Sequence, residues 1–277
     1  MCSQDENKNI LIQEQSKSFS KRPSYNKSFK SPVNNIDNNN NIDINYDIFK
    51  NDIDLNLLNY RLALLLDKRT YIEYYWSLLK QKQLILFTFV LRNDYNLLIV
   101  KISFFLFIFS LTFNINGFFF TNNNIPQLYK GNGQYDLIYE FPHIIFSSVV
   151  SYVISIILKS FILPWKDVYK LKMENNKNLF LDKCKNMETY LKIKLMIFFI
   201  INFIFMSFFW YFISCFCAVF VNTQIALIKN TIISFILLMI YPFGINLLPG
   251  VFRISALKQK NKRKNCIYKI GQIIALF

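Results

Sequence analysis

Four long apolar stretches dominate the second part of this sequence and restrict what it can fold into. They run from Leu97 to Phe120, from Ile138 to Leu163, from Leu195 to Val221 and from Ile225 to Phe252. Phe, Ile and Leu predominate in each, and charged residues concentrate in the gaps and near the ends. A helix of about 20 apolar residues crosses the hydrocarbon core of a bilayer. The sequence therefore predicts an all-α integral membrane bundle of four transmembrane helices.

The distribution of lysine and arginine predicts which ends of the spans face the cytosol. The chain has 32 basic and 17 acidic residues, a formal net charge of +15. Basic residues cluster before the first stretch, between the second and third, and after the fourth, whereas Lys130 alone occupies the first loop and Lys229 lies near the third. Cytosolic loops carry such an excess. We therefore expect both termini in the cytosol, and no nucleic-acid surface, because the charge follows the topology.

The four stretches define a transmembrane domain over residues 95–254. The sequence ahead of this domain divides into two parts. Residues 1–54 are polar and rich in Asn, too poor in apolar side chains to offset chain entropy, which predicts a disordered cytosolic tail. Residues 55–94 contain apolar and polar residues on opposite faces of a helix: Ile72, Tyr75, Trp76 and Leu79 against Glu73, Ser77, Lys80 and Gln81. This pattern predicts an amphipathic helix on the membrane surface, or packed beneath the spans.

A second amphipathic element is predicted in the basic tail, residues 255–277. Its basic residues are Lys258, Lys260, Lys262, Arg263 and Lys264. Apolar residues follow at helical spacing: Ile267, Ile270, Ile274 and Phe277. We expect these five basic side chains to contact anionic lipid headgroups, where each is worth about 1 kcal/mol. The alternative is that the basic run only fixes orientation, and that the last residues dock on the bundle.

Two features inside the spans predict how the helices pack. Ser147, Ser151 and Ser155 recur every four residues, which lets a neighbouring helix approach closely and offers hydroxyls for interhelical bonds. The alternative for this repeat is a polar stripe lining a pathway, to which Asn116 would contribute. In the fourth stretch Pro242 removes a backbone hydrogen bond and predicts a kink.

No group of residues in the sequence predicts catalysis or metal binding. The only histidine, His143, lies with Glu140 near the outer end of the second stretch, so no Ser-His-Asp set is available within the spans. There is no glycine-rich phosphate loop. The five cysteines form no CxxC pair and indicate neither a disulfide framework nor a zinc site. We therefore expect no enzyme, cofactor or bound metal.

The stretch FWYFISCFCAVFVNTQIALIKNTIISFILLMIYPFGINLLPGVFRISALK, Phe209 to Lys258, resembles an uncharacterised multi-pass module of AT-rich protist, especially ciliate, proteins. INGFFFTNNNIPQLY and YEFPHIIFSSVVSYVISIILK resemble earlier parts of the same module. In that group the modules look like C-terminal membrane anchors of larger proteins, sometimes with adhesion-like regions ahead. This chain departs from that pattern in its short polar N-terminus, so the resemblance implies a span layout but no adhesive role and no ligand residues.

Together these patterns predict a non-enzymatic membrane anchor or scaffold. The alternative is a channel or transporter subunit that acts as a homo-oligomer, because four short-looped helices with few polar groups leave little room for a pore. A hydrated path along Ser147, Ser151 and Asn116 would favour that alternative. The expected partners are membrane lipids with anionic headgroups, further copies of the chain or other membrane proteins.

Overall fold

The computed structural model describes residues 33–34, 43–44, 51–91, 94–120, 136–173, 177–221, 223–258 and 264–275. These residues belong to one folding unit, Pro32–Phe277. Most of the tail predicted to be disordered, residues 1–54, lies outside the described ranges. Two short strands, β1 (Val33–Asn34) and β2 (Asp43–Ile44), pair antiparallel with Val33 opposite Ile44. Every other regular element described is a helix.

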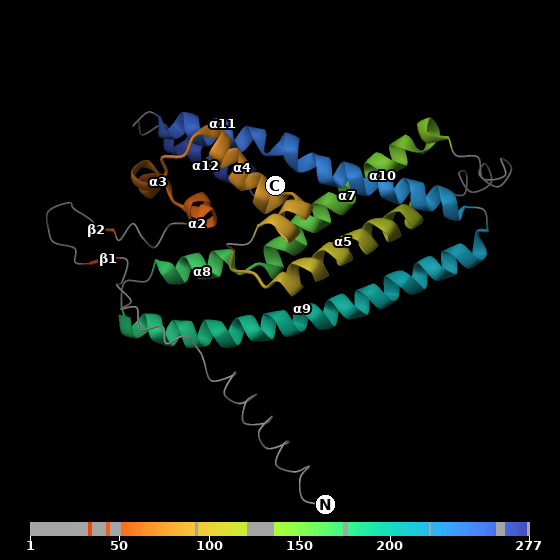
Figure 1. The fold of residues 1–277 in the computed structure, drawn as a ribbon, viewed down its shortest axis with the longest axis horizontal. Helices are drawn as coiled ribbons and strands as arrows, with labels where there is room; N and C mark the ends of the chain where they lie inside the picture. Colours follow the sequence, from red (N-terminus) through yellow and green to blue (C-terminus); the bar gives the residue numbers. More distant parts are fainter. Residues whose placement is uncertain are drawn as a thin grey trace, which may run out of the picture. The chain divides into compact units, whose positions relative to one another are not determined.

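Four helices are long and apolar enough to cross a membrane, which confirms the predicted all-α membrane bundle. The first span is α5 (Leu98–Phe118), and the second contains α7 (Leu137–Ile162). The third lies within α9 (Lys177–Val219), and the fourth contains α10 (Gln224–Ile245). Helix α5 contacts the other three, and α7 also packs on α10 (Figure 1). Helix α9 leaves most of its surface exposed, with Phe203 and Tyr211 among its outward side chains. An apolar exposed surface of this kind suits contact with lipid.

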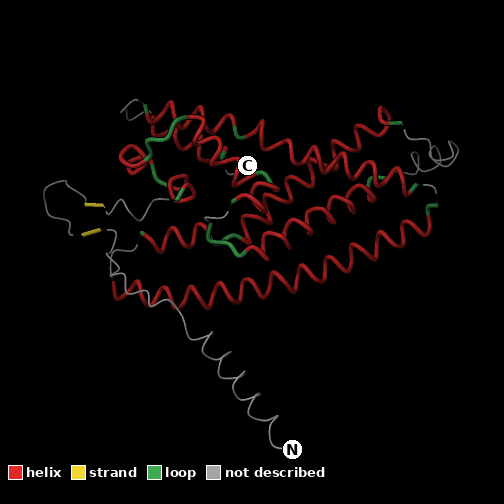
Figure 2. Tube along the Cα trace, viewed as in Figure 1, coloured by secondary structure: helices red, strands yellow, loops and turns green. Residues whose placement is uncertain are grey.

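The third span belongs to a much longer helix than the apolar stretch predicts. Helix α9 has 43 residues and begins at Lys177, well ahead of the predicted Leu195. Figure 2 shows it as one uninterrupted helix. In its first part Lys192 pairs with Glu188 at 2.8 Å, a spacing of one turn that supports a solvated helix. Polar residues with good helix propensity therefore extend the helix beyond the segment that hydropathy identifies.

The fourth apolar stretch is divided after Ile245, while a kink at Pro242 stays a prediction. Helix α10 continues through Pro242 to Ile245, and α11 (Leu247–Leu257) begins after Asn246. The backbone N–H and the side-chain Nδ2 of Asn246 both donate to the carbonyl of Pro242, at 3.2 and 2.7 Å. The interruption thus falls one turn after the proline, where an asparagine side chain competes for a helical carbonyl.

Helix α4 (Tyr71–Lys82) packs against this interruption. The hydroxyls of Tyr71 and Tyr75 donate to the carbonyls of Leu247 and Phe243, at 3.1 and 3.0 Å. A Cβ at Gly250 would lie 2.6 Å from Cε2 of Tyr71, so only glycine permits this approach. Two tyrosines of α4 therefore bond to carbonyls on either side of the junction between α10 and α11.

The short helices gather at one end of the bundle, together with α11 (Figure 1). They are α2 (Asp52–Leu57), α3 (Tyr60–Leu66), α4, α8 (Trp165–Lys172) and α12 (Lys264–Ile274). We call α2, α3, α4, α8, α11 and α12 the cap. Helix α12 packs on α11 and α3, while α2 packs on α4 and α8. A π-helical turn, η2 (Leu86–Val90), follows α4 and contacts α5.

Helix α4 confirms the predicted amphipathic helix, and a capping box between Thr70 and Glu73 begins it. Ile72 and Trp76 of the predicted apolar face point outward and are 73% and 47% exposed, whereas Leu79 of the same face is buried. Ser77 and Gln81, from the predicted polar face, are buried as well. The inward face of α4 is therefore mixed, and the outward Ile72 and Trp76 are available to a membrane surface.

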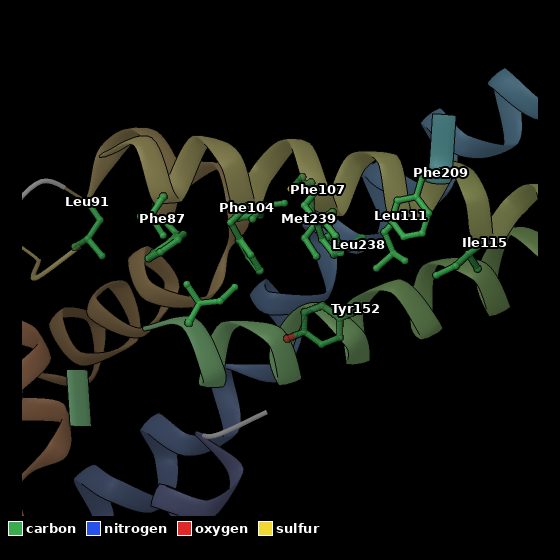
Figure 3. Close-up of a cluster of buried hydrophobic side chains, with 14 of the residues drawn as sticks. Phe87, Leu91, Phe104, Phe107, Leu111, Ile115, Tyr152, Phe209, Leu238 and Met239 are labelled. Carbon is green, nitrogen blue, oxygen red and sulfur yellow. The ribbon is translucent and has the colours of Figure 1, made fainter. Parts of the chain in front are cut away.

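The interior of the bundle is built largely from aromatic side chains. Figure 3 shows Phe104 and Leu111 of α5 pointing toward α7, where Tyr152 lies. The rings of Phe107 and Phe209 are 5.6 Å apart, which joins α5 to α9. Such contacts between rings add to the burial of apolar surface. This core connects the spans to the cap through Phe87 of η2.

Candidate functional site

A buried arginine on α11 ties the fourth apolar stretch to the segment that precedes the first. Arg253 is 1% exposed, and its Nε and Nη2 donate to Oδ2 of Asp67 at 3.0 and 2.7 Å. Its Nη2 also donates to the carbonyl of Leu55 at 2.6 Å. Burial of a guanidinium costs free energy unless the charge is paired and hydrogen-bonded. These contacts explain how Arg253 can lie in the interior.

A second arginine holds the same carboxylate. Nε of Arg69 donates to Oδ1 of Asp67 at 2.8 Å, and its Nη2 to Oδ2 at 3.0 Å. The guanidinium of Arg253 lies between two rings, 4.8 Å from the centroid of Tyr74 and 4.9 Å from that of Tyr268. Planar guanidinium groups suit both contacts. We call Asp67, Arg69, Tyr74, Arg253 and Tyr268 the clasp.

The surroundings of the clasp determine how its groups titrate. Burial raises the pKa of Asp67, but the hydrogen bonds and charges of Arg69 and Arg253 outweigh burial and hold that pKa below 3.8. Burial raises the pKa of Tyr74 and of Tyr268 above the ordinary value. At neutral pH Asp67 is thus a carboxylate, and Tyr74 and Tyr268 are neutral phenols.

Further ion pairs and a tyrosine hydroxyl connect cap helices with the turn before α5. Nζ of Lys172 on α8 lies 2.5 Å from Oδ2 of Asp54, which is fully buried on α2. The hydroxyl of Tyr95 donates to the same carboxylate at 2.7 Å. At the start of α5, the buried Lys101 pairs with Asp94 at 2.6 Å. These pairs fasten α2, α8 and the turn before α5 to one another.

Polar side chains between α5, α7 and α10 bond across the helices. Three pairs do so: Asn230 with Glu140 at 2.9 Å, Ser234 with Asn116 at 3.1 Å, and Ser148 with Tyr241 at 2.6 Å. All six except Tyr241 are buried. We call these six residues the polar seam. Hydrogen bonds between helices satisfy polar groups that would otherwise lie in hydrocarbon.

The predicted serine repeat is partly buried beside this seam. Ser147 and Ser151 have no exposed surface, and their hydroxyls have no hydrogen-bond partner among the described residues. Ser155 bonds to the carbonyl of Tyr152 in its own helix at 2.7 Å. Small size, rather than a hydroxyl bond, is therefore what Ser147 and Ser151 contribute in this arrangement. Their role in helix packing stays a prediction.

The residues predicted to contact lipid headgroups are only partly described. Lys260, Lys262 and Arg263 lie outside the described residues. Lys258 is exposed, and Lys264 donates to the carbonyl of Ser255 at 3.4 Å. Contact of these side chains with anionic lipid stays a prediction.

Helix α12 uses one face to dock on the bundle, as the alternative reading of the tail proposes. Tyr268 and Gly271 are buried against the cap, and the hydroxyl of Tyr268 donates to the carbonyl of Leu58 at 2.7 Å. Ile270 and Ile273 remain exposed on another face of the same helix. Docking therefore leaves apolar side chains of α12 available for the membrane.

A cavity of about 580 Å³ lies between α4, α7, α8 and α12. Each of these four helices contributes one lysine to its wall: Lys82, Lys159, Lys166 and Lys269. The sequence does not predict that these four lysines lie together, because they are far apart in the chain and their pattern indicates only the orientation of the spans. The one local signal was Lys159, which interrupts an apolar stretch before that stretch ends at Leu163.

Comparison with known proteins adds no residue to these sites. No family model matches the chain, and comparisons with curated proteins and with solved structures give no match either. The resemblance to protist membrane modules stays a prediction. Any function must follow from the side chains themselves.

Proposed function

We propose that this chain is an integral membrane anchor in which four spans hold a rigid cap at the cytosolic surface. The orientation rests on the basic residues, which flank the span ends that meet the cap. Both termini then lie on the cytosolic side. One observation carries the proposal, namely the clasp, because it joins the segment before the first span to the last helix of the spanning stretches.

The clasp supports anchoring because it fastens the segment with Asp67 and Arg69, which precedes the first span, to Arg253 of α11, which continues the fourth apolar stretch. Removing one partner of a buried ion pair costs about 3–5 kcal/mol, so local opening at Arg253 should be rare. The pair between Lys172 and Asp54 adds a second connection, from α8 to α2. Residues 51–91 are thereby held against the spans. This arrangement suits an anchor, because these residues connect the N-terminal tail to the first span.

The polar seam favours an anchor over a channel or transporter subunit. A conducting path needs polar groups that face water along the membrane. The seam residues on α5, α7 and α10 bond to one another, and Ser147 and Ser151 are fully buried beside them. We propose no reaction for the clasp, because its carboxylate and guanidinium groups are hydrogen-bonded to one another.

Limited proteolysis of the purified full-length chain tests whether the clasp holds the cap. Wild-type residues 51–91 should resist cleavage, and Asp67→Ala should expose them. The matched control is Asp52→Ala, whose side chain is 40% exposed and pairs with Lys80 at 3.1 Å and, at 3.6 Å, with Nη1 of Arg69 rather than with the Nε and Nη2 that hold Asp67. Equal cleavage of the wild type and Asp67→Ala would refute a clasped cap.

Ion flux separates the anchor from the channel reading. The full chain in liposomes should pass no more cations, anions or protons than protein-free vesicles do. The variant Ser234→Leu, which fills the seam, should leave that background unchanged. Flux in the wild type that Ser234→Leu abolishes would establish a path along the seam and overturn the anchor.

A further inference from the structure

The lysine-lined cavity has a buried floor and an exposed mouth. Tyr74, Leu78 and Gln81 of α4 are buried at its floor. Lys166 and Lys269 are exposed lining residues, so the cavity is reached from the surface of the protein. Its volume of about 580 Å³ is within the range of roughly 300–1,000 Å³ found for small-molecule sites. The cavity is therefore large enough for the polar part of a lipid and a segment of its chain.

Positive charge dominates the wall of this cavity. Four lysines line it, and none of its described lining residues is acidic. Burial, together with the charge of Lys166, lowers the pKa of Lys82 to about 8. Nζ of Lys159 donates to the carbonyl of Gln81 and lies 3.7 Å from the centroid of Phe87. A bound anion would stabilise the protonated form of these neighbouring lysines.

Two buried donors at the same cavity point independently to a ligand with acceptor atoms. Nε2 of Gln81 and Nε1 of Trp165 are buried and have no hydrogen-bond partner among the described residues. Gln81 is only 5% exposed, and both residues line the cavity. Buried donors in proteins are almost always satisfied, because an unmade hydrogen bond costs free energy. Lysine, amide and indole N–H groups are all hydrogen-bond donors, so together they favour a ligand with anionic oxygen atoms.

One part of the wall is apolar and lies where a membrane span ends. Leu78, Ile156 and Leu163 line it beside the ring of Trp165. Ile156 belongs to the spanning helix α7, which ends at Ile162, and Trp165 begins α8. Tryptophan and snorkelling lysine are typical of the depth at which lipid headgroups meet acyl chains. An anion held at this depth has an apolar surface directly beside it.

We propose that the cavity between α4, α7, α8 and α12 binds an anionic lipid of the surrounding leaflet, with its phosphate among Lys82, Lys159, Lys166 and Lys269 and an acyl chain along Leu78, Ile156 and Leu163. This site is separate from the basic tail residues Lys258 and Lys264, which do not line the cavity. The site goes beyond anchoring, since it selects a lipid by charge.

Native mass spectrometry of the full-length chain in detergent tests the site with phosphatidic acid and phosphatidylcholine as probes. Phosphatidic acid should bind about tenfold or more tightly, because ionised contacts are stronger than neutral ones. The variant Lys166→Gln, at an exposed position that should not disturb folding, and the double variant Lys82→Gln with Lys166→Gln should progressively remove this preference. The control Lys170→Gln removes the same charge from the same helix at an exposed position outside the cavity.

Two further measurements separate a lipid site from a site for free phosphate or a general effect of charge. Inorganic phosphate should fail to displace the lipid, because it lacks the chain that contacts the apolar wall. Ser160→Trp, which keeps all four lysines but fills the mouth, should abolish lipid binding while unfolding at the wild-type temperature. Equal binding of the two lipids, equal loss in Lys170→Gln and Lys166→Gln, or full competition by phosphate would each overturn a lipid site.

Discussion

Removal of the Asp67 carboxylate should destabilise the protein more than any exposed charge change in the cap. In Asp67→Ala, Arg253 loses both hydrogen bonds to the carboxylate but stays buried, where the carbonyls of Leu55 and Asn56 still accept from it without compensating its charge. Arg69 loses the same partner. Breaking a buried pair in this way costs about 3–5 kcal/mol, and we expect a loss near the middle of that range.

Two comparisons separate this effect from a general loss of charge. Asp52→Ala removes an exposed carboxylate that pairs with Lys80 at 3.1 Å and with Arg69 at 3.6 Å, and should cost at most about 1 kcal/mol because both pairs are partly solvated. The double variant Asp67→Leu with Arg253→Met removes the buried charge along with its partner. It should recover much of the loss, because a well-packed apolar pair can replace a buried ion pair.

Denaturant unfolding in detergent measures the loss in the free energy of unfolding, and hydrogen exchange of the α12 amides shows whether that helix opens. The pH dependence gives a second readout, because the pKa of Asp67 is lowered in the folded state. The stability that it contributes is complete above its unfolded-state value of 3.8 and is lost as the pH falls through the lower folded-state pKa. Asp67→Ala should lack this acid-dependent loss. If Asp67→Ala and Asp52→Ala unfold alike, the clasp does not stabilise the cap.

Three further predictions follow from particular contacts. Gly250→Ala should cost about 1–3 kcal/mol, because its Cβ would lie 2.6 Å from Cε2 of Tyr71, whereas Gly244→Ala, with nothing within 4 Å, should be neutral or stabilising in thermal unfolding. Ser151→Leu should lower the unfolding temperature and Ser151→Ala should not, since its hydroxyl has no partner among the described residues; equal effects would contradict a packing role. Stability should rise between pH 8 and 10.5, because the folded state releases the Lys82 proton first, and Lys82→Met should flatten that rise.

The transmembrane helices could be predicted from the sequence because span length and hydropathy are local properties. The predicted stretch from Leu97 to Phe120 differs from α5 by only a few residues. The start of α9 could not be predicted in the same way, because the residues from Lys177 onward mix lysines and other polar residues with short apolar groups and form no continuous apolar stretch. The junction at Asn246 was missed because Pro242 was the stronger local signal.

The clasp and the cavity could not be predicted because they depend on contacts between distant segments. Asp67 and Arg253 are 186 residues apart in the chain. Arg253 follows an apolar stretch directly, so in the sequence it is indistinguishable from the basic residues that orient a span. Its burial depends on α4 and α12 meeting around α11, and no local pattern encodes that meeting.

Cysteine labelling in sealed vesicles tests the four-span anchor most directly. Ser255→Cys lies in the cap, and Asn132→Cys lies between the first two spans, outside the described residues; both are placed in a chain whose native cysteines are replaced by serine. A membrane-impermeant maleimide should label Ser255→Cys only from the cytosolic side and Asn132→Cys only from the opposite side. Labelling of both from one side, or the reverse pattern, would contradict four spans with a cytosolic cap.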